Sequence, residues 1–370
     1  MAQSVGGRCA ADGHPRRTYA GVVTTTTNHS PLLDRHGAVP GEGLDAGVAA
    51  HYGDPMREQR LLEQGLAAVD LSHRGVVTVT GPDRRSWLHS MTTQSLTDLP
   101  PHTSTESLVL SPHGHVEHAL HVLDDGTTTW LSVEPGTAPA LVEWLDKMRF
   151  MLRVEVADVT DAYAVLGEPI GSESLPAELD SRGVIAWRDP WPELGADSAP
   201  YSEVEVHPAT GRAWRELIVP RDRLVAEIGD RPLAGTWAAE AERVAAWRPR
   251  LGVDTDHRTI PHELDWLRTA VHLHKGCYRG QETIARVHNL GRPPRRLVFL
   301  HLDGSGHVLP DAGADLVTAP GERPVGRITS VARHVDDGPI ALGVVKRNTP
   351  VDAALYAGEV AAAQTPIVAP

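Results

Sequence analysis

The clearest pattern of hydrophobic and polar positions begins at Val76. Residues 76–80 (VVTVT) are β-branched throughout and end at Gly81-Pro82, which predicts a strand running into a turn. Asp83 then stands where its carboxylate can cap a helix, and apolar residues repeat at helical spacing as far as Met91. We therefore expect a strand, a turn and an amphipathic helix in succession.

Similar patterns recur along the chain. Apolar residues at helical spacing follow Thr137 and stop before the strand-like segment 152–156. Residues 216–220 (ELIVP) predict another strand, and residues 221–228 predict a helix. The pattern therefore mixes strands with helices.

Two regions lack this regularity. Residues 1–45 are rich in Gly, Thr, His and Pro without apolar periodicity, so we interpret them as a flexible tail, with order beginning near Val48. Residues 169–200 carry several prolines together with Trp187 and Trp191. They predict a loop-rich excursion within a domain.

The carboxyl-terminal part has a different pattern. After Arg296, short apolar stretches at 297–302, 327–331 and 340–345 alternate with Gly, Asp and Pro turns. Regularly spaced short strands with turns between them favour an all-β closing domain.

Composition limits the class of protein. A chain of 370 residues is long enough for two or three domains. It has no apolar run long enough to span a bilayer and no amino-terminal basic region followed by an apolar core. The only cysteines are Cys9 and Cys277, and a disulfide between them is improbable because Cys9 falls in the predicted tail. We therefore expect a cytoplasmic protein.

The net charge of −13 argues against broad binding to nucleic acids, whose phosphates need a surface rich in Lys and Arg. The densest basic run outside the tail is Arg292, Arg295 and Arg296. It is interpreted either as a solvated loop entering a strand or as a contact for phosphate or polyglutamate.

The most informative short segment is residues 275–282, KGCYRGQE. Lys275 and Arg279 flank Cys277, and both cations would stabilise its thiolate by Coulomb attraction. A helix is predicted to start at Gln281, which would place Cys277 near the positive end of that helix. The alternative is that Cys277 is an inert, buried small residue in a tight turn.

This segment resembles the K-G-C-Y-x-G-Q-E motif of the YgfZ family of folate-binding proteins, which are relatives of the aminomethyltransferase (T-protein) of the glycine cleavage system. Residues 243–254 and 260–263 are similar to two further family segments, with matches that include Arg243, Pro249 and Arg250 and with departures at Ala245 and Trp247. The similarity covers roughly residues 50–350.

The resemblance implies an α+β fold of three subdomains around a central folate channel, the last a small β-barrel. We expect a tail at 1–45, an aminomethyltransferase-like folate-binding region of two interleaved α+β subdomains at 46–290, and the barrel at 291–370. It also implies a tetrahydrofolate-binding accessory protein that supports iron–sulphur cluster assembly or repair, so the implied partners are folate and iron–sulphur proteins or their assembly machinery.

The same resemblance suggests site residues. Cys277, with Lys275 and Arg279, would carry redox or transient ligand chemistry. Glu216, in a segment similar to the G-x-E-[IL]-x-V-P of the aminomethyltransferases, would accept two pterin N–H donors as a bidentate carboxylate; the alternative is a surface carboxylate on a strand. The remaining implied folate contacts are Arg243, Arg250, Tyr278 and Gln281.

Other kinds of site find little support. The histidines of residues 113–121 lack the spacing of a metal site, because His118 and His121 would point to opposite faces of a strand, and we expect no metal. No Walker motif, dinucleotide fingerprint or G-x-S-x-G elbow occurs in the sequence.

Two rival functions remain open. The first is a true folate-dependent aminomethyltransferase, which needs a carboxylate near the folate nitrogens. At the positions of that family's paired aspartates this chain has His118 and Ala119, and only Glu117, one residue earlier, is acidic. The second rival is a folate-linked demethylase or oxidase subunit.

Overall fold

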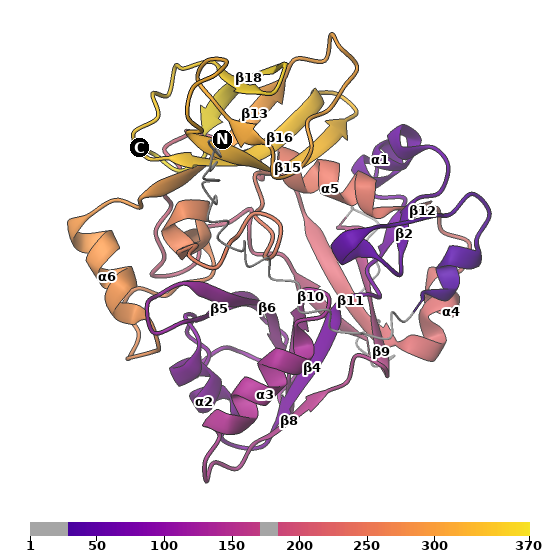
Figure 1. Ribbon diagram of the computed structural model, residues 1–370. Coiled ribbons are helices and arrows are strands. Elements are labelled where there is room, and N and C mark those ends of the chain that lie inside the picture. Colours follow the sequence, from indigo (N-terminus) through magenta and orange to yellow (C-terminus); the bar gives the residue numbers. More distant parts are fainter. Residues whose placement is uncertain (1–28, 171–183) are drawn as a thin grey trace, which may run out of the picture.

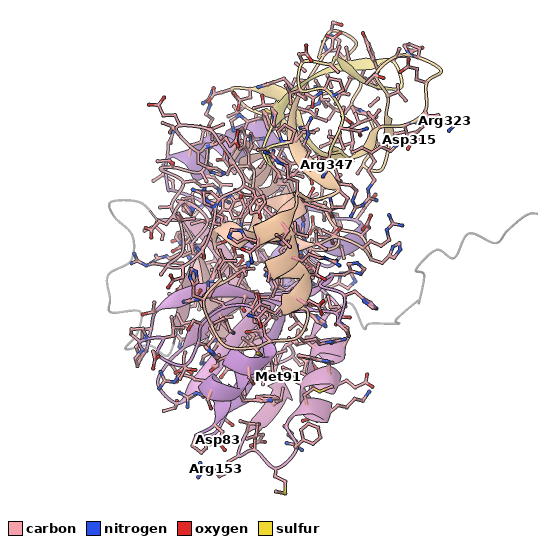
Figure 2. The ribbon with its side chains drawn as sticks, turned by 90° about the vertical axis from the view of Figure 1, so that its left-hand side faces the viewer. Asp83, Met91, Arg153, Asp315, Arg323 and Arg347 are labelled. Atoms are coloured by element: carbon pink, nitrogen blue, oxygen red, sulfur yellow. The ribbon has the colours of Figure 1, made fainter. Side chains whose placement is uncertain are left out.

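The computed structural model describes residues 29–170 and 184–370. Three regions are arranged around a common centre, with a β-barrel at one end of the molecule and a sheet with two helices at the other (Figure 1). Figure 2 shows Asp315 and Arg323 of the barrel at one extremity, and Asp83 and Arg153 at the opposite one. The predicted tail as far as residue 28, including Cys9, lies outside the described residues.

The first region is a five-stranded antiparallel sheet with two helices on one face. The strand order is β5-β6-β7-β4-β8. Its core packs the apolar side chains of β4, β6 and β7 against Trp87 and Leu88 of one helix and Leu141 and Leu145 of the other. The elements are β4 (Gly75–Thr80), α2 (Arg84–Met91), β5 (Ser104–Leu110), β6 (Val116–Asp124), β7 (Thr128–Val133), α3 (Ala138–Met148) and β8 (Glu155–Asp158).

The second region is a mixed five-stranded sheet in the order β10-β11-β9-β3-β12. Only the β12–β3 pair is parallel. Helices α1 and α5 pack against each other, and both lie beside this sheet in Figure 1. The elements are β1 (Val39–Pro40), β2 (Ala49–His51), α1 (Pro55–Glu63), β3 (Ala68–Asp70), β9 (Tyr163–Pro169), β10 (Ile185–Arg188), β11 (Trp214–Pro220), α4 (Leu224–Ile228), β12 (Leu233–Ala234) and α5 (Thr236–Ala245).

The third region confirms the predicted closing β domain. Six strands follow one another in the order β14-β15-β16-β13-β18-β17, and a bridge between Val317 and Tyr356 brings the two ends of the sheet together. The result is a nearly closed barrel around an apolar core. The elements are α6 (Gln281–Leu290), which precedes the barrel, and β13 (Arg295–Leu302), β14 (Asp315–Leu316), β15 (Gly326–His334), β16 (Gly338–Lys346), β17 (Leu355–Ala357) and β18 (Val360–Pro366).

Short 3-10 helices and loops fill the space between these regions. They contribute Trp191, Trp247 and Trp266 to the largest apolar cluster, which also includes side chains of β5 and β13. This cluster therefore joins the first sheet to the barrel. The 3-10 helices are Pro31–Asp34, Gly43–Asp45, Arg221–Arg223, Pro261–Leu264 and Trp266–Arg268.

Several local expectations differ from the structure. Regular elements begin at Pro31 rather than near Val48, because the short turns before residue 46 pack on the rest of the protein despite their polar composition. Asp83 precedes α2 as expected, but its carboxylate pairs with Arg153 rather than capping the helix. Trp187, in the segment predicted as loop, is buried within β10.

Among the described residues, no helix is both long enough and apolar enough to cross a membrane.

A buried carboxylate ties the loop after α5 to the barrel. Asp254 has no exposed surface and accepts hydrogen bonds from Arg243 Nη1 at 2.8 Å and from the hydroxyls of Thr329 and Ser330 on β15, at 2.5 and 2.7 Å. Because a buried charge is stabilised only by such partners, the junction depends on all of them together.

Replacing Asp254 with alanine should lower the free energy of unfolding by about 3–5 kcal/mol, because Arg243 would stay buried without one of its anions. Urea unfolding followed by fluorescence measures this change. Asp315→Ala, at an exposed position of β14, is the control and should change stability by less than about 0.5 kcal/mol. A loss below about 1 kcal/mol for Asp254→Ala would contradict this role.

Candidate functional site

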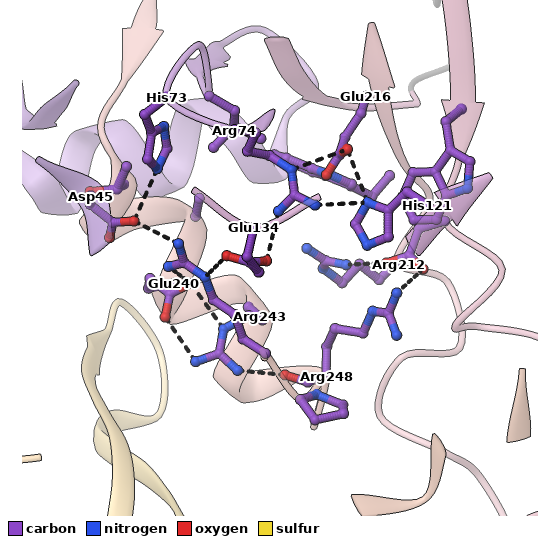
Figure 3. A pocket seen from close by; sticks show the side chains of 18 residues that line it. Asp45, His73, Arg74, His121, Glu134, Arg212, Glu216, Glu240, Arg243 and Arg248 are labelled. Atoms are coloured by element: carbon purple, nitrogen blue, oxygen red, sulfur yellow. Dashed lines mark hydrogen bonds and ion pairs between the residues drawn. The ribbon is translucent and has the colours of Figure 1, made fainter. Parts of the chain in front are cut away.

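The central cavity lies where the two sheets, α5 and the loop that follows α5 meet, and it is the candidate site. Its volume is ≈ 100 Å³. It shares Arg212 and Trp214 with a neighbouring cavity of ≈ 270 Å³. Figure 3 shows the side chains around it, which are Asp45, Leu71, His73, Arg74, His121, Glu134, Trp187, Asp189, Arg212, Trp214, Glu216, Thr236, Ala239, Glu240, Arg243, Arg248, Pro249 and Arg250.

Glu216 on β11 is buried in this cavity and is not a surface carboxylate. Its Oε2 accepts a hydrogen bond from Ser132 Oγ at 2.9 Å, lies 3.0 Å from His121 Nδ1 and lies 3.6 Å from Arg74 Nε. Burial alone would raise the pKa of Glu216, but the charges of Arg74 and His121 and the hydrogen bonds from His121 and Ser132 outweigh it and hold the pKa far below its ordinary value. Glu216 is therefore ionised.

The two oxygens of Glu216 differ. Oε2 is occupied by protein partners, whereas Oε1 has no hydrogen-bond partner among the described residues and is not enclosed. A ligand therefore meets one free oxygen. The bidentate contact expected from the sequence would require Oε2 to serve a ligand as well as Ser132 and His121.

His121 was not identified from the sequence as part of this site. It lies on β6, on the face opposite Leu120 and Val122, which pack towards α2 and α3. Its ring stacks on the Trp187 indole, with the ring centroids 3.8 Å apart and the planes at 1°. The indole N–H of Trp187 donates to the carbonyl of Thr105 at 2.7 Å, which fixes the indole in turn.

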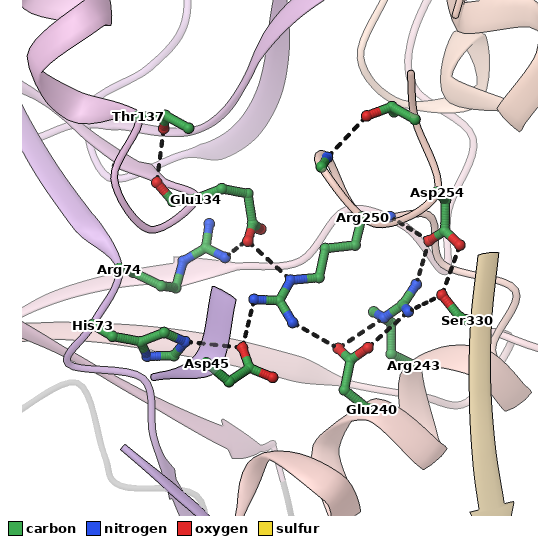
Figure 4. A network of polar contacts seen from close by, with 12 residues as sticks. Asp45, His73, Arg74, Glu134, Thr137, Glu240, Arg243, Arg250, Asp254 and Ser330 are labelled. Atoms are coloured by element: carbon green, nitrogen blue, oxygen red, sulfur yellow. Dashed lines mark hydrogen bonds and ion pairs between the residues drawn. The ribbon is translucent and has the colours of Figure 1, made fainter. Parts of the chain in front are cut away.

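A network of buried ion pairs forms one wall of the cavity (Figure 4). Arg250 uses all three nitrogens of its guanidinium: Nε donates to Glu134 at 2.9 Å, Nη2 to Asp45 at 2.8 Å and Nη1 to Glu240 at 3.3 Å. Arg74 donates to the other oxygen of Glu134 at 2.8 Å. Burial disfavours the charge of Arg250, but the charges of Glu134, Glu240 and Asp45 raise its pKa well above the ordinary value.

Arg243 is similarly engaged. It pairs with Glu240 and Asp254, both at 2.8 Å, and donates to Ser330 at 2.7 Å. Arg243 and Arg250 thus line the cavity, but protein carboxylates already neutralise them; their proposed contact with folate stays a prediction.

Arg212 is the arginine of the cavity with the weakest pairing. Among the described residues its one ion pair is with Asp189 at 3.4 Å, and the guanidinium lies 5.2 Å from the centre of the Trp214 ring. Burial lowers its pKa, and the charges of Asp189 and Glu242 only partly offset this effect. Because it borders both cavities, Arg212 is available to an anionic ligand. Nothing in its local sequence distinguishes it from other arginines.

The KGCYRGQE segment lies apart from the cavity, since none of its residues is among those that line it. Cys277 is exposed, which excludes the buried alternative. Lys275 donates to the backbone carbonyls of His89, Thr92 and Gln94 at the end of α2, and it lies 5.2 Å from the centre of the Tyr278 ring. Arg279 pairs with Glu117 at 3.0 Å. Both cations therefore have partners other than the thiol.

The geometry of the segment depends on Gly280, which precedes α6. Its φ is +81°, and a Cβ there would lie 2.6 Å from the carbonyl oxygen of Ser111. This position therefore requires glycine. Tyr278 is buried in the large apolar cluster, and Gln281 begins α6; their proposed contact with folate stays a prediction.

The histidine-rich run forms the turn before β6 and the strand itself. As expected, His118 and His121 lie on opposite faces, and Ala119 shares the face of His121. Burial lowers the pKa of His118 to about 4. Among the described residues, the carboxylates and imidazole close enough to hold a metal ion are Glu63, Glu242 and His334, outside this run.

Comparison with known proteins agrees with this architecture. Residues 31–167 match the family described as the GCVT N-terminal domain. A putative chloroplastic transferase of Arabidopsis thaliana is 26% identical over 334 residues, which cover 85% of this chain and 73% of that protein. The tRNA-modifying protein YgfZ of Edwardsiella ictaluri is 27% identical over 296 residues, covering 75% of this chain and 84% of that protein.

An aminomethyltransferase of Bordetella petrii is 25% identical over 265 residues, which cover 66% of this chain and 70% of that protein. Among solved structures, the glycine cleavage system aminomethyltransferase T of Bartonella henselae superimposes with a TM-score of 0.70 at 20% identity, covering 92% of this chain and 95% of that one. This similarity establishes the aminomethyltransferase fold. Together, these matches show that the chain is similar in sequence to YgfZ and to aminomethyltransferases and that it shares the aminomethyltransferase fold.

Proposed function

We propose that the central cavity binds a reduced folate, tetrahydrofolate or a close derivative, and that the protein acts as a folate-binding accessory protein. The observation that carries the proposal is Glu216, an ionised and buried carboxylate whose Oε1 is free. A pterin ring presents N–H and amino donors, and a charge-assisted hydrogen bond to such a donor is roughly twice as strong as a neutral one.

The groups around Glu216 suit the remaining parts of a folate molecule. The two cavities that meet at Arg212 and Trp214 together reach the range of about 300–1,000 Å³ that small-molecule sites occupy. Trp187 and Trp214 provide flat aromatic surface beside the pterin position. The glutamate end of the folate carries carboxylates, and Arg212 is the cation least engaged by protein anions.

The accessory role is the second part of the proposal. We infer from the family resemblance that the protein supports iron–sulphur enzymes in the cytoplasm and that Cys277 takes part through redox or transient ligand chemistry. The exposure of Cys277 supports this role, because a thiol must be reachable to react or to ligate. Since Lys275 and Arg279 are engaged elsewhere, the reactivity of Cys277 depends on its accessibility more than on these neighbours.

A true aminomethyltransferase is the second candidate, because several relatives carry that name. That chemistry needs a carboxylate near the folate nitrogens. At the corresponding positions, Ala119 has no ionisable group, and His118 lies on the opposite face, towards α2 and α3. Both observations favour the accessory role.

Tetrahydrofolate at a hundredfold excess over its dissociation constant should stabilise the protein by about 2.7 kcal/mol, which a thermal-shift assay detects.

Glu216→Gln should weaken binding by about 1.5–3 kcal/mol because the charge-assisted contact is lost. Arg212→Gln should weaken the binding of tetrahydrofolate but leave unchanged the binding of a tetrahydropterin fragment that lacks the glutamate tail.

The matched control is Glu168→Gln, which removes another buried carboxylate, on the neighbouring strand β9 and outside the cavity. It should leave affinity unchanged in the folded variant. A melting temperature that reduced folates do not move, or equal losses for Glu216→Gln and Glu168→Gln, would refute the proposed site.

Supplied with an aminomethyl-loaded lipoyl carrier protein and tetrahydrofolate, the protein should form no methylene-tetrahydrofolate above the enzyme-free rate, because Ala119 supplies no carboxylate. Release of ammonia and appearance of methylene-tetrahydrofolate are the readouts. Carrier-dependent product well above that background would establish the transferase instead.

Cys277 should be alkylated in the native protein, because it is exposed. The measurement uses a Cys9→Ser background, so that one thiol remains. Cys277→Ala should retain the fold and folate binding yet fail to restore iron–sulphur enzyme activity in a host that lacks the native gene. If this variant complements fully, Cys277 has no part in the function.

A further inference from the structure

Glu216 and His121 form a carboxylate–imidazole pair whose protonation can be assigned from the contacts. Nδ1 of His121 lies 3.0 Å from Oε2 of the ionised Glu216 and 3.3 Å from Nη2 of Arg74. An unprotonated Nδ1 would set its lone pair against a carboxylate oxygen. The distance to Arg74 is long for a hydrogen bond, so Nδ1–H donates to Glu216, and in the neutral form of the ring the lone pair lies on Nε2.

The pair is held in place by its surroundings. Ser132 Oγ accepts from Arg74 Nε at 2.9 Å and donates to Glu216 Oε2 at 2.9 Å, which fixes the carboxylate. The parallel stack on Trp187 fixes the plane of the imidazole. A carboxylate that orients an imidazole is the arrangement by which many enzymes prepare a histidine as a general base.

The second nitrogen of the ring is free. Among the described residues, Nε2 of His121 has no hydrogen-bond partner, and it is not an enclosed atom. We propose that His121 and Glu216 are an acid–base pair in which Nε2 of His121 takes a proton from an amine nitrogen of the ligand bound in the central cavity. The identity of that ligand as a reduced folate rests on the function proposed above; the pair itself does not.

In this step the ligand's N–H bond breaks, its electron pair stays on the nitrogen and a new N–H bond forms at Nε2. One positive charge moves from the protonated amine to the imidazole. The resulting imidazolium faces the negative charge of Glu216, while Arg74 opposes it and is itself neutralised by Glu134. No oxidant or further reactant is needed, and the step reverses when His121 returns the proton.

The position of His121 also bears on the proposed distinction between this chain and a transferase. Ala119 offers no ionisable group on the cavity face of β6, and His121, two residues further along the same face, does. An imidazole can gain and lose a proton, which suits proton exchange with the ligand more than stabilisation of a lasting positive charge.

The first test observes the wild-type protein directly. Nitrogen-15 NMR of histidine-labelled protein reports which ring nitrogen carries the proton, and His121→Gln identifies its signals. We expect the Nδ1–H tautomer for His121 at neutral pH and a shift of the Nε2 signal when tetrahydrofolate is added. An Nε2–H tautomer in the free protein, or an Nε2 signal that bound folate leaves unmoved, would overturn the proposal.

The second test measures the basicity of Nε2 through acylation by diethyl pyrocarbonate, followed at His121 by peptide mass spectrometry. Glu216→Gln permits the other tautomer and should slow this acylation by roughly tenfold or more, whereas exposed His113 should react at an unchanged rate and serves as the internal control. Equal rates at His121 in wild type and Glu216→Gln would overturn the proposal.

The outcomes separate the two claims. If thermal shift detects no folate binding, the proposed function fails, and the pair is judged by the tautomer and the acylation rates alone. If folate binds but does not protect His121 from acylation, the folate site stands and the acid–base role of His121 is refuted.

Discussion

The fold depends on charges buried in pairs at its centre. Arg74, Arg243 and Arg250 lie with their carboxylate partners where the two sheets, α5 and the barrel meet. Burying an isolated ion costs several kcal/mol, and removing one partner of a buried pair is strongly destabilising. Since each partner comes from a different element, as Figure 4 shows for Asp45, Glu134 and Glu240, the network forms only when the regions assemble in one arrangement.

This constraint decides which groups remain for a ligand. Because Arg243 and Arg250 are neutralised, the groups that the described residues leave open to a ligand include Oε1 of Glu216, Nε2 of His121 and the weakly paired guanidinium of Arg212. An acceptor, a base and a cation along one connected space favour a ligand with a donor-rich ring at one end and an anion at the other. The network thus supports the candidate site by holding its walls in place.

Local pattern predicted much of the fold. The strand at residues 76–80 follows from its β-branched residues, and the helix after it follows from the spacing of its apolar residues. The barrel strands were also predictable, because short apolar stretches alternate with turn residues. Resemblance identified Glu216. The pairing of Asp45 with Arg250 could not be predicted, because it joins residues 205 positions apart in sequence.

The roles proposed for His121 and Arg212 could not be predicted from the sequence, for related reasons. The position of His121 depends on the strand register that stacks its ring on Trp187. The availability of Arg212 depends on which arginines the ion-pair network leaves weakly paired. Lys275 and Arg279 illustrate the converse: adjacency to Cys277 suggested that they act on the thiol, but their side chains reach the end of α2 and Glu117. Proximity in sequence does not fix the direction of a long side chain in a loop.

The most direct test of the account is a crystal structure of the protein with tetrahydrofolate. We expect density for the pterin beside Glu216, with a ring donor within hydrogen-bond distance of Oε1, and for the glutamate end near Arg212. Ordered folate elsewhere, for example against the Cys277 loop with the central cavity unchanged, would contradict it.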